Sequence, residues 1–165
     1  GSLPSFPITL SAMPNDKLPC YDANNIGDKD WLALVKCEFD HQTKTENFAK
    51  VAAKIRPIAA TQTTVDCELT IEPEHVNRKG TLHGGFSATL IDLITSRAIG
   101  LASGNRSRST VDLSASYLLP VRLGQKVLLK ATVLQVNKSM AFAEIDIVRE
   151  DGKIAVKGKQ TMAFA

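Results

Sequence analysis

The stretch NRKGTLHGGFSATLIDLITSRAIG, residues 77–100, combines a glycine pair, a long apolar run and one acidic residue within that run. From Gly84 onward apolar residues lie on almost every side, which is typical of a helix buried over most of its surface. The stretch therefore predicts a central helix over residues 84–101. Asp92 lies inside this helix, and a buried carboxylate is unfavourable unless it is paired or functional.

The glycines at the start of this helix, Gly84 and Gly85, predict a point where a ligand can approach the backbone. The first N–H groups of a helix have no intrahelical partner, and glycine leaves them uncovered. The helix dipole adds partial positive charge, so these groups can stabilise a carbonyl oxygen that becomes an oxyanion. The structural alternative is a glycine-rich turn that only joins a strand to the helix.

Three polar residues near the glycines are the other candidates for chemistry. Asp92 lies about two turns beyond Gly84 and within roughly 80° of the same side. Its structural alternative is a bond to the backbone or to Arg97. His83 suits either a base or a helix-entry residue, and Asn77 suits either a ligand donor or a turn. None of the three decides a function by itself.

The flanking sequence predicts an antiparallel sheet around this helix. An N-terminal helical pattern begins near its expected N-cap, Asp28, has a polar break at 40–47, and ends before Pro57. Alternating residues predict strands in TTVDCELTIEP (63–73), STVDLSASYLL (109–119), QKVLLKATVLQV (125–136), MAFAEIDIVRE (140–150) and KIAVKGKQTMAF (153–164). The last four are expected as an antiparallel meander. The result is an α+β domain at 46–165 behind an N-terminal arm with a helix at 1–45.

Composition places the chain among ordinary globular proteins. Its 165 residues suit one domain, and a net charge of +3 is too small and scattered to indicate a nucleic-acid partner. No apolar run reaches the roughly 18 residues of a membrane span. The widely spaced Cys20, Cys37 and Cys67 predict free thiols, with neither a disulfide framework nor a zinc site. An intracellular location, cytoplasmic or mitochondrial, is expected.

The pattern N-x-x-G-T-L-H-G-G-x-x-A-T-L-x-D, from Asn77 to Asp92, resembles the hotdog-fold acyl-CoA thioesterases, in the phenylacetyl-CoA-type and thioesterase superfamily member 2-like branch. The resemblance runs from about residue 47 to the C-terminal end. It implies an antiparallel sheet wrapped around one long helix, in a homodimer that pairs again into a homotetramer. It also implies hydrolysis of fatty or aromatic acyl-CoA, with no cofactor beyond the coenzyme A of substrate and product.

The resemblance implies catalytic roles for five positions. Gly84 matches the residue whose backbone N–H polarises the thioester carbonyl, with Asn77 assisting. Asp92 matches a carboxylate that acts from the other subunit, as general base on water or as nucleophile. His83 matches a histidine that helps shape the site, and Thr110 replaces a serine that orients the attacking water.

Substrate-binding positions are expected around these residues. Relatives use the turn matching Asn137-Lys138-Ser139 and a residue matching Tyr117 near the nucleotide or pantetheine. Gly85 is expected at the ligand beside Gly84, and Arg108 is among the basic residues expected to meet coenzyme A phosphates.

Two alternatives and one structural expectation complete the prediction. A non-catalytic acyl-CoA binding or sensing protein is the alternative from another class, and a hotdog hydratase is the alternative among enzymes. Intact Asp92 and Asn77 favour the thioesterase. Even-numbered positions of the strand at 109–119 are expected to share one face, which places Asp112 beside Thr110 as a structural or pocket-lining residue.

Overall fold

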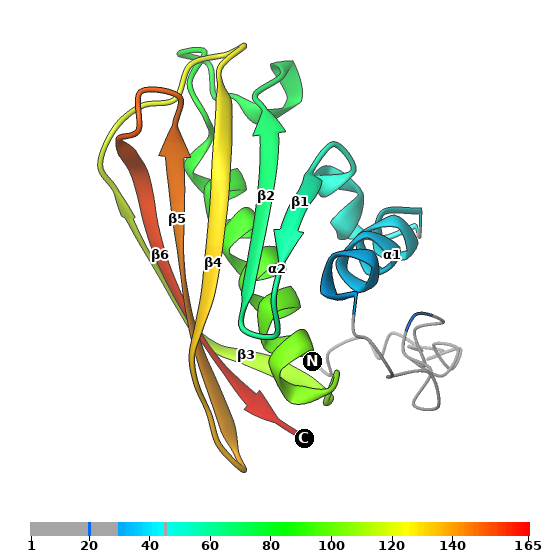
Figure 1. Ribbon diagram of the computed structural model, residues 1–165. Coiled ribbons are helices and arrows are strands. Elements are labelled where there is room, and N and C mark those ends of the chain that lie inside the picture. Colours follow the sequence, from blue (N-terminus) through cyan, green and yellow to red (C-terminus); the bar gives the residue numbers. More distant parts are fainter. Residues whose placement is uncertain (1–19, 21–29, 45) are drawn as a thin grey trace, which may run out of the picture.

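A computed structural model describes residue 20, residues 30–44 and residues 46–165. Its elements are α1 (Trp31–Lys44), the 3₁₀ helix η1 (Phe48–Ala52), β1 (Arg56–Ala60), β2 (Thr64–Thr70), the 3₁₀ helix η2 (Pro73–His75), α2 (Gly84–Ser103), β3 (Arg108–Tyr117), β4 (Lys126–Val136), β5 (Met140–Arg149) and β6 (Ile154–Phe164). One antiparallel six-stranded sheet curves around α2, and α1 lies beside the β1 edge (Figure 1). This is the predicted α+β architecture.

The strand order β1-β2-β4-β5-β6-β3 corrects the predicted meander of the last four strands. β4, β5 and β6 are neighbours as expected, but β3 pairs with β6 and β4 pairs with β2. The reason is that residues 118–125 do not form a tight turn. They cross the start of α2, where the Leu82 N–H donates to the Val121 carbonyl oxygen at 2.7 Å. Among the described strands, β3 is therefore bonded on one side only.

The central helix α2 begins where the sequence predicts and extends two residues further than expected, to Ser103. Its fully buried face includes Leu90, Ile91 and Ile94. Each such side chain contributes about 1.5–3 kcal/mol when it leaves water. β6 approaches α2 closely because it carries Gly158 there, where a Cβ would lie 2.5 Å from Ile91 Cγ1. In the described part of the chain, no helix is long and apolar enough to cross a membrane.

α1 is fastened to the core by apolar packing and a buried ion pair. Val35 and Phe39 belong to the hydrophobic core. Glu38 is fully buried, and its Oε2 lies 2.7 Å from Nη1 of Arg97 on α2. Removing one partner of a buried pair costs about 3–5 kcal/mol, because the other charge is left unpaired. The pair therefore couples the position of α1 to that of the central helix.

The boundaries of α1 follow local capping and the polar break. Asp30 Oδ1 accepts a hydrogen bond from the Ala33 N–H at 3.0 Å and caps the helix. The expected N-cap, Asp28, lies outside the described residues. The predicted break at 40–47 starts too early, because α1 continues to Lys44 and η1 begins at Phe48.

A disulfide joins Cys20 to Cys37, with a Cα–Cα distance of 6.1 Å, and corrects the prediction of three free thiols. The 17-residue separation gave no sign of this contact, because no local pattern encodes the proximity of two cysteines so far apart along the chain. Disulfides are typical of oxidising environments, so the cysteines no longer support a reducing compartment. Cys67 is free and buried, and burial raises the pKa of its thiol to about 12.

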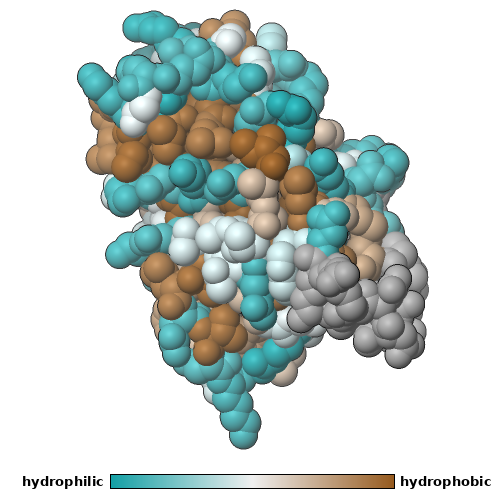
Figure 2. Space-filling model, in the orientation of Figure 1, coloured by the Kyte–Doolittle hydropathy of each residue, from teal (hydrophilic) through white to brown (hydrophobic). Residues whose placement is uncertain are grey.

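The outer face of the sheet, away from α2, carries paired charges. Lys130 of β4 lies opposite Asp146 of β5, and the Nζ of Lys157 on β6 is 2.8 Å from Asp146 Oδ1. In the view of Figure 1, hydrophilic side chains separate smaller hydrophobic patches on the surface (Figure 2). This charge-paired face suits contact with solvent. The candidate site residues lie on the opposite face, which packs against α2.

Candidate active site

Asp92 and Thr110 meet beside the middle of α2, and a β-bulge in β3 brings them together. The pairing of β3 with β6 shifts between Thr110 and Asp112, which leaves Val111 as an extra residue. A bulge reverses the alternation of side chains. Thr110 consequently faces α2, where its hydroxyl donates to Asp92 Oδ1 at 3.1 Å. The prediction that Thr110 and Asp112 share a face is wrong, since Asp112 is exposed on the other face.

Gln160 of β6 completes this cluster, although the sequence pattern did not single it out. Its side chain is 1% exposed, and its Nε2 donates to Asp92 Oδ1 at 2.8 Å and to Thr110 Oγ1 at 2.6 Å. The available signal was a polar residue at an inward position of β6, between Gly158 and Met162. A buried amide needs partners, but alternation alone does not say which residues they are.

The Asp92 carboxylate is bound at one oxygen. All hydrogen bonds that it receives from the described residues end on Oδ1, and none ends on Oδ2. The side chain is half-buried, as the sequence indicated. Arg97, its alternative partner, pairs with Glu38 instead. Two donors therefore hold Asp92 and leave Oδ2 available to water or substrate.

The first turn of α2 begins with an N–H, that of Gly84, for which the described residues provide no acceptor. The Gly85 N–H donates to His83 Nδ1 at 2.9 Å, and the Ser87 N–H donates to the His83 carbonyl oxygen at 2.9 Å. Among the described residues, nothing accepts a hydrogen bond from the Gly84 N–H. His83 is therefore the N-cap of α2, with Nδ1 as acceptor and its proton on Nε2. The two glycines are not equivalent, because only Gly84 can donate to a ligand.

A cavity of about 290 Å³ lies against Gly84. Its lining is mostly apolar and consists of Leu82, Gly84, Tyr117, Leu118, Leu119, Pro120 and Val121. The Tyr117 hydroxyl donates to the Gly84 carbonyl oxygen at 2.7 Å and fixes the end of β3 to the start of α2. A Cβ at position 84 would meet the Tyr117 ring at 3.4 Å, an ordinary contact. The protein's own packing therefore does not require glycine at position 84.

Asn77 closes the turn that precedes α2. Its Nδ2 donates to Thr81 Oγ1 at 3.0 Å, and its Oδ1 accepts from the Lys79 N–H at 2.9 Å. These bonds match the turn-forming alternative considered from the sequence. An amide nitrogen carries two hydrogens, so one N–H of the Asn77 side chain stays available for a ligand.

His75 packs against the first turn of α2 and the residue before it. Its ring stacks on Phe86 with centroids 4.6 Å apart, and its carbonyl oxygen accepts from the His83 N–H at 2.9 Å. Its Nδ1 accepts from the Glu72 N–H at 3.0 Å. Burial lowers the pKa of His75, although Glu74 opposes this shift. The neutral ring is therefore the form that fits beneath the helix.

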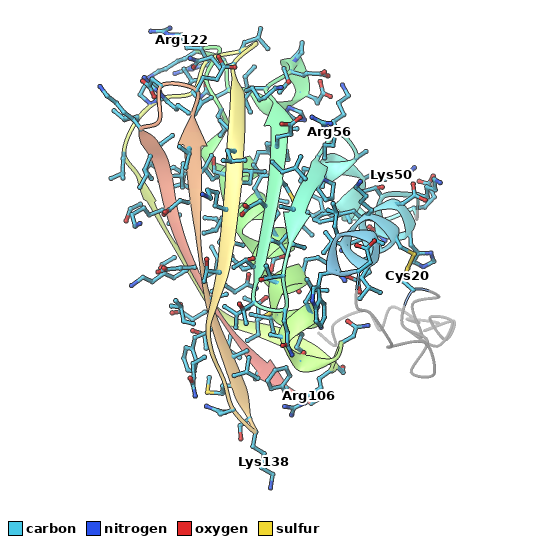
Figure 3. All side chains as sticks on the ribbon, in the orientation of Figure 1. Cys20, Lys50, Arg56, Arg106, Arg122 and Lys138 are labelled. Carbon is cyan, nitrogen blue, oxygen red and sulfur yellow. A yellow bond between two sulfur atoms is a disulfide. The ribbon has the colours of Figure 1, made fainter. Side chains whose placement is uncertain are left out.

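The remaining predicted residues lie toward the other end of α2. The turn 137–139 joins β4 to β5 at the bottom of Figure 1, and Figure 3 labels Lys138 there. Arg106 lies beside it and donates to the Lys138 carbonyl oxygen at 2.7 Å. Arg108 donates to the carbonyl oxygen of Ser96 at 2.7 Å and braces α2. Lys138 is exposed, whereas the Arg108 guanidinium is held by the protein.

Within one chain, Gly84 and Asp92 are too far apart to act on the same thioester. α2 rises about 1.5 Å per residue, which puts Asp92 about 12 Å along the helix from Gly84. A thioester bonded to the Gly84 N–H is out of reach of Asp92 in the same chain. Tyr117 lies with Gly84, and Thr110 and Gln160 lie with Asp92.

Comparisons with known proteins identify the family of this chain. The model of the thioesterase superfamily matches residues 79–156. Human acyl-coenzyme A thioesterase 13 is 37% identical over 120 residues, which cover 72% of this chain and 86% of that protein. The chain belongs to the thioesterase superfamily.

Solved thioesterase structures share the fold. Zebrafish thioesterase superfamily member 2 superposes with a TM-score of 0.79 at 32% identity, over 81% of this chain and 98% of that one. The mouse protein of the same name gives a TM-score of 0.71 at 29% identity, over 82% and 95%. The predicted hotdog fold is confirmed, and this thioesterase is a thioester hydrolase.

Proposed function

We propose that this thioesterase hydrolyses fatty or aromatic acyl-CoA in a site shared by two chains. The observation that carries the proposal is the separation along α2 of an unused N–H, at Gly84, from a carboxylate with a free oxygen, at Asp92. Neither group completes a thioester site alone, whereas a two-fold partner can bring them together. The printed name of the human relative, an acyl-coenzyme A thioesterase, supports the substrate class.

The proposed reaction transfers the acyl group from sulfur to water. The Gly84 N–H, with the spare Asn77 N–H, stabilises the carbonyl oxygen as it becomes an oxyanion. Asp92 from the second chain removes a proton from water oriented by Thr110, or attacks the carbon itself. In the base route the water oxygen bonds to the carbonyl carbon, the C–S bond breaks, and the sulfur leaves as coenzyme A thiol with the proton that Asp92 took. In the nucleophile route an Asp92 oxygen bonds to the carbon and the thiolate leaves; water then hydrolyses the mixed anhydride, which frees the acid and Asp92 and supplies the proton of the thiol. His83 assists by capping α2 and aligning the Gly84 N–H.

The rest of the substrate is proposed to follow the surface around these groups. The apolar cavity beside Gly84 and Tyr117 suits a chain attached to the thioester. The turn 137–139 offers the exposed ammonium of Lys138 to a phosphate. Arg108 contributes indirectly, because it donates to the carbonyl oxygen of Arg106 at 2.9 Å and holds the loop beside that turn.

The second chain is proposed to pair through β3. Among the described strands, this strand is bonded only to β6, and its Val111 side chain is 54% exposed. One end of β3 reaches Asp92 through Thr110, and the other reaches Gly84 through Tyr117. Antiparallel pairing of two β3 strands places opposite ends together. It therefore brings the Asp92 of one chain toward the Gly84 of the other.

The test is release of free thiol from short, medium, long and phenylacetyl acyl-CoAs by wild type and Asp92→Asn. We expect the variant to lose about 10²–10⁴-fold in kcat, because the general base is removed. Substrate binding should stay near that of wild type, since the side chain keeps its shape. Asp112→Asn is the matched control, because Asp112 lies on the exposed face of β3. This variant should hydrolyse acyl-CoA at the wild-type rate.

Two results would contradict this assignment. Equal turnover by Asp92→Asn and wild type would exclude Asp92 as base or nucleophile. Binding of acyl-CoA without turnover by wild type would make the protein a binding or sensing module.

A further inference from the structure

Gln160 has every side-chain hydrogen-bonding atom engaged inside the protein. Its Nε2 bonds Asp92 Oδ1 at 2.8 Å and Thr110 Oγ1 at 2.6 Å. Its Oε1 faces the hydroxyl of Thr95, a fully buried residue of α2. The same hydroxyl lies 2.7 Å from the carbonyl oxygen of Ile91. One buried amide thus links β6, β3 and two turns of α2.

The charge of Asp92 determines the direction of every bond in this group. An ionised carboxylate only accepts, so the nitrogen of the Gln160 amide must face it. The amide oxygen then faces Thr95, whose single proton must be given to Gln160 rather than to the Ile91 carbonyl oxygen. Thr110 accepts from Gln160 and donates its own proton to Asp92. With Asp92 Oδ1 as the acceptor, each donor of this group faces one acceptor.

We infer that Gln160 is a positioning residue that presents Asp92 to the reaction with Oδ2 free. The inference rests on the proposed function, in which Asp92 is the base or nucleophile. The amide fixes Oδ1, and Thr95 fixes the amide. Gln160 has no proton to lose near neutral pH, so it supplies its donors at every working pH. It also orients the Thr110 hydroxyl, whose remaining lone pair can accept from the attacking water.

Two substitutions distinguish a positioning role of Gln160 from a role in packing alone. Gln160→Leu keeps the bulk but removes both donors, and Gln160→Glu keeps the shape but places a second carboxylate beside Asp92. We expect Gln160→Leu to lower kcat about 10- to 100-fold, the range for hydrogen bonds to a charged group, with little change in KM. The acid limb of its pH–rate profile should move to higher pH, and that of Gln160→Glu should move further through like-charge repulsion.

The matched control is Thr161→Val, the next residue of β6, which pairs with the outward-facing Asp112. It should keep the wild-type kcat and pH profile. Thermal unfolding of all variants establishes that they are folded. Wild-type kcat and pH profiles in folded Gln160→Leu and Gln160→Glu would overturn the inference.

An NMR titration tests the same inference without turnover. The carboxyl ¹³C signal of Asp92 is assigned by its loss in Asp92→Asn, then followed with pH in wild type and Gln160→Leu. The midpoint should be higher in Gln160→Leu, because the carboxylate has lost a donor. An unchanged midpoint overturns the role of Gln160 even if acyl-CoA is hydrolysed. A raised midpoint without hydrolysis by wild type supports Gln160 and counts against the proposed function.

Discussion

Gly84 and Gly85 are neighbours that are glycine for different reasons. A Cβ at position 84 would touch Tyr117 at 3.4 Å, whereas a Cβ at position 85 would lie 3.1 Å from the His83 ring. We expect Gly84→Ala to keep wild-type stability but to lose on the order of 10²-fold in kcat, because the methyl group displaces the substrate oxygen. Gly85→Ala should lower the free energy of unfolding by about 0.5–2 kcal/mol by disturbing the helix cap. Thermal unfolding and thiol release measure both effects.

Each glycine variant is the control for the other. An equal loss of stability in both variants would show that position 84 is glycine for packing. At this scale, the sequence could select Gly84 and Asp92 as candidates because both lie within one predicted helix. It could not identify Gln160, whose partners Asp92 and Thr110 are 68 and 50 residues away along the chain.

At the scale of elements, the ends of strands and helices were more predictable than their faces. Each of the five predicted strand segments overlaps an observed strand, because alternation is a local signal; β3 begins one residue before its predicted segment. β1 was missed, since its five residues include Pro57 and show little alternation. The bulge in β3 was missed because it depends on how the strand pairs with β6. That bulge decides which residue of β3 faces Asp92.

The start of α2 should weaken at acid pH through His75. Protonation turns Nδ1 into a donor, which can no longer accept from the Glu72 N–H. Burial lowers the folded-state pKa of His75 below 6.5, so the unfolded state binds the proton more readily. The stabilisation is therefore present above pH 6.5 and is lost as the pH falls through the folded-state pKa. The free energy of unfolding, measured by denaturant, should be lower at pH 5.5 than at pH 7.5.

His75→Phe is the matched variant for this prediction, because it retains a ring that can stack on Phe86. It should be less stable than wild type at pH 7.5 by about 1–3 kcal/mol, since the Glu72 N–H loses its acceptor. Its stability should change less between the two pH values. The same pH dependence in both proteins would assign the effect to other groups.

At the scale of the whole molecule, the layers of the fold were predictable and the sheet order was not. One nearly all-apolar helix and several alternating strands admit few arrangements other than a sheet covering a helix. The order depends on the path of residues 118–125 across the start of α2, which no local pattern encodes. The Cys20–Cys37 disulfide was missed for the same reason. Contacts between segments far apart in the sequence determine the strand order and the disulfide, which local sequence patterns do not predict.

The proposed dimer has a register that follows from β3 itself. Opposite residues of an antiparallel pair point to the same face. Thr110 and Tyr117 both face α2, so Thr110 of one chain can lie opposite Tyr117 of the other. With Val111 as the extra residue of the bulge, residues 112–116 then pair with 116–112 of the partner strand. Ser114, exposed on the outer face, lies opposite its own copy.

Ser114→Cys should therefore form a covalent dimer under mild oxidation, seen as a doubled mass on non-reducing electrophoresis. Directly opposed Cα atoms lie about 4.5–5.5 Å apart, within the range of a disulfide. Ser116→Cys, on the same face of the same strand, is the matched control, because its two copies are offset by four residues or about 13 Å. It should stay unlinked. Linking of Ser116→Cys but not Ser114→Cys would require another register, and linking of neither would place the shared site away from β3. If the linked Ser114→Cys dimer still releases thiol from acyl-CoA, this register is the one present in the active enzyme.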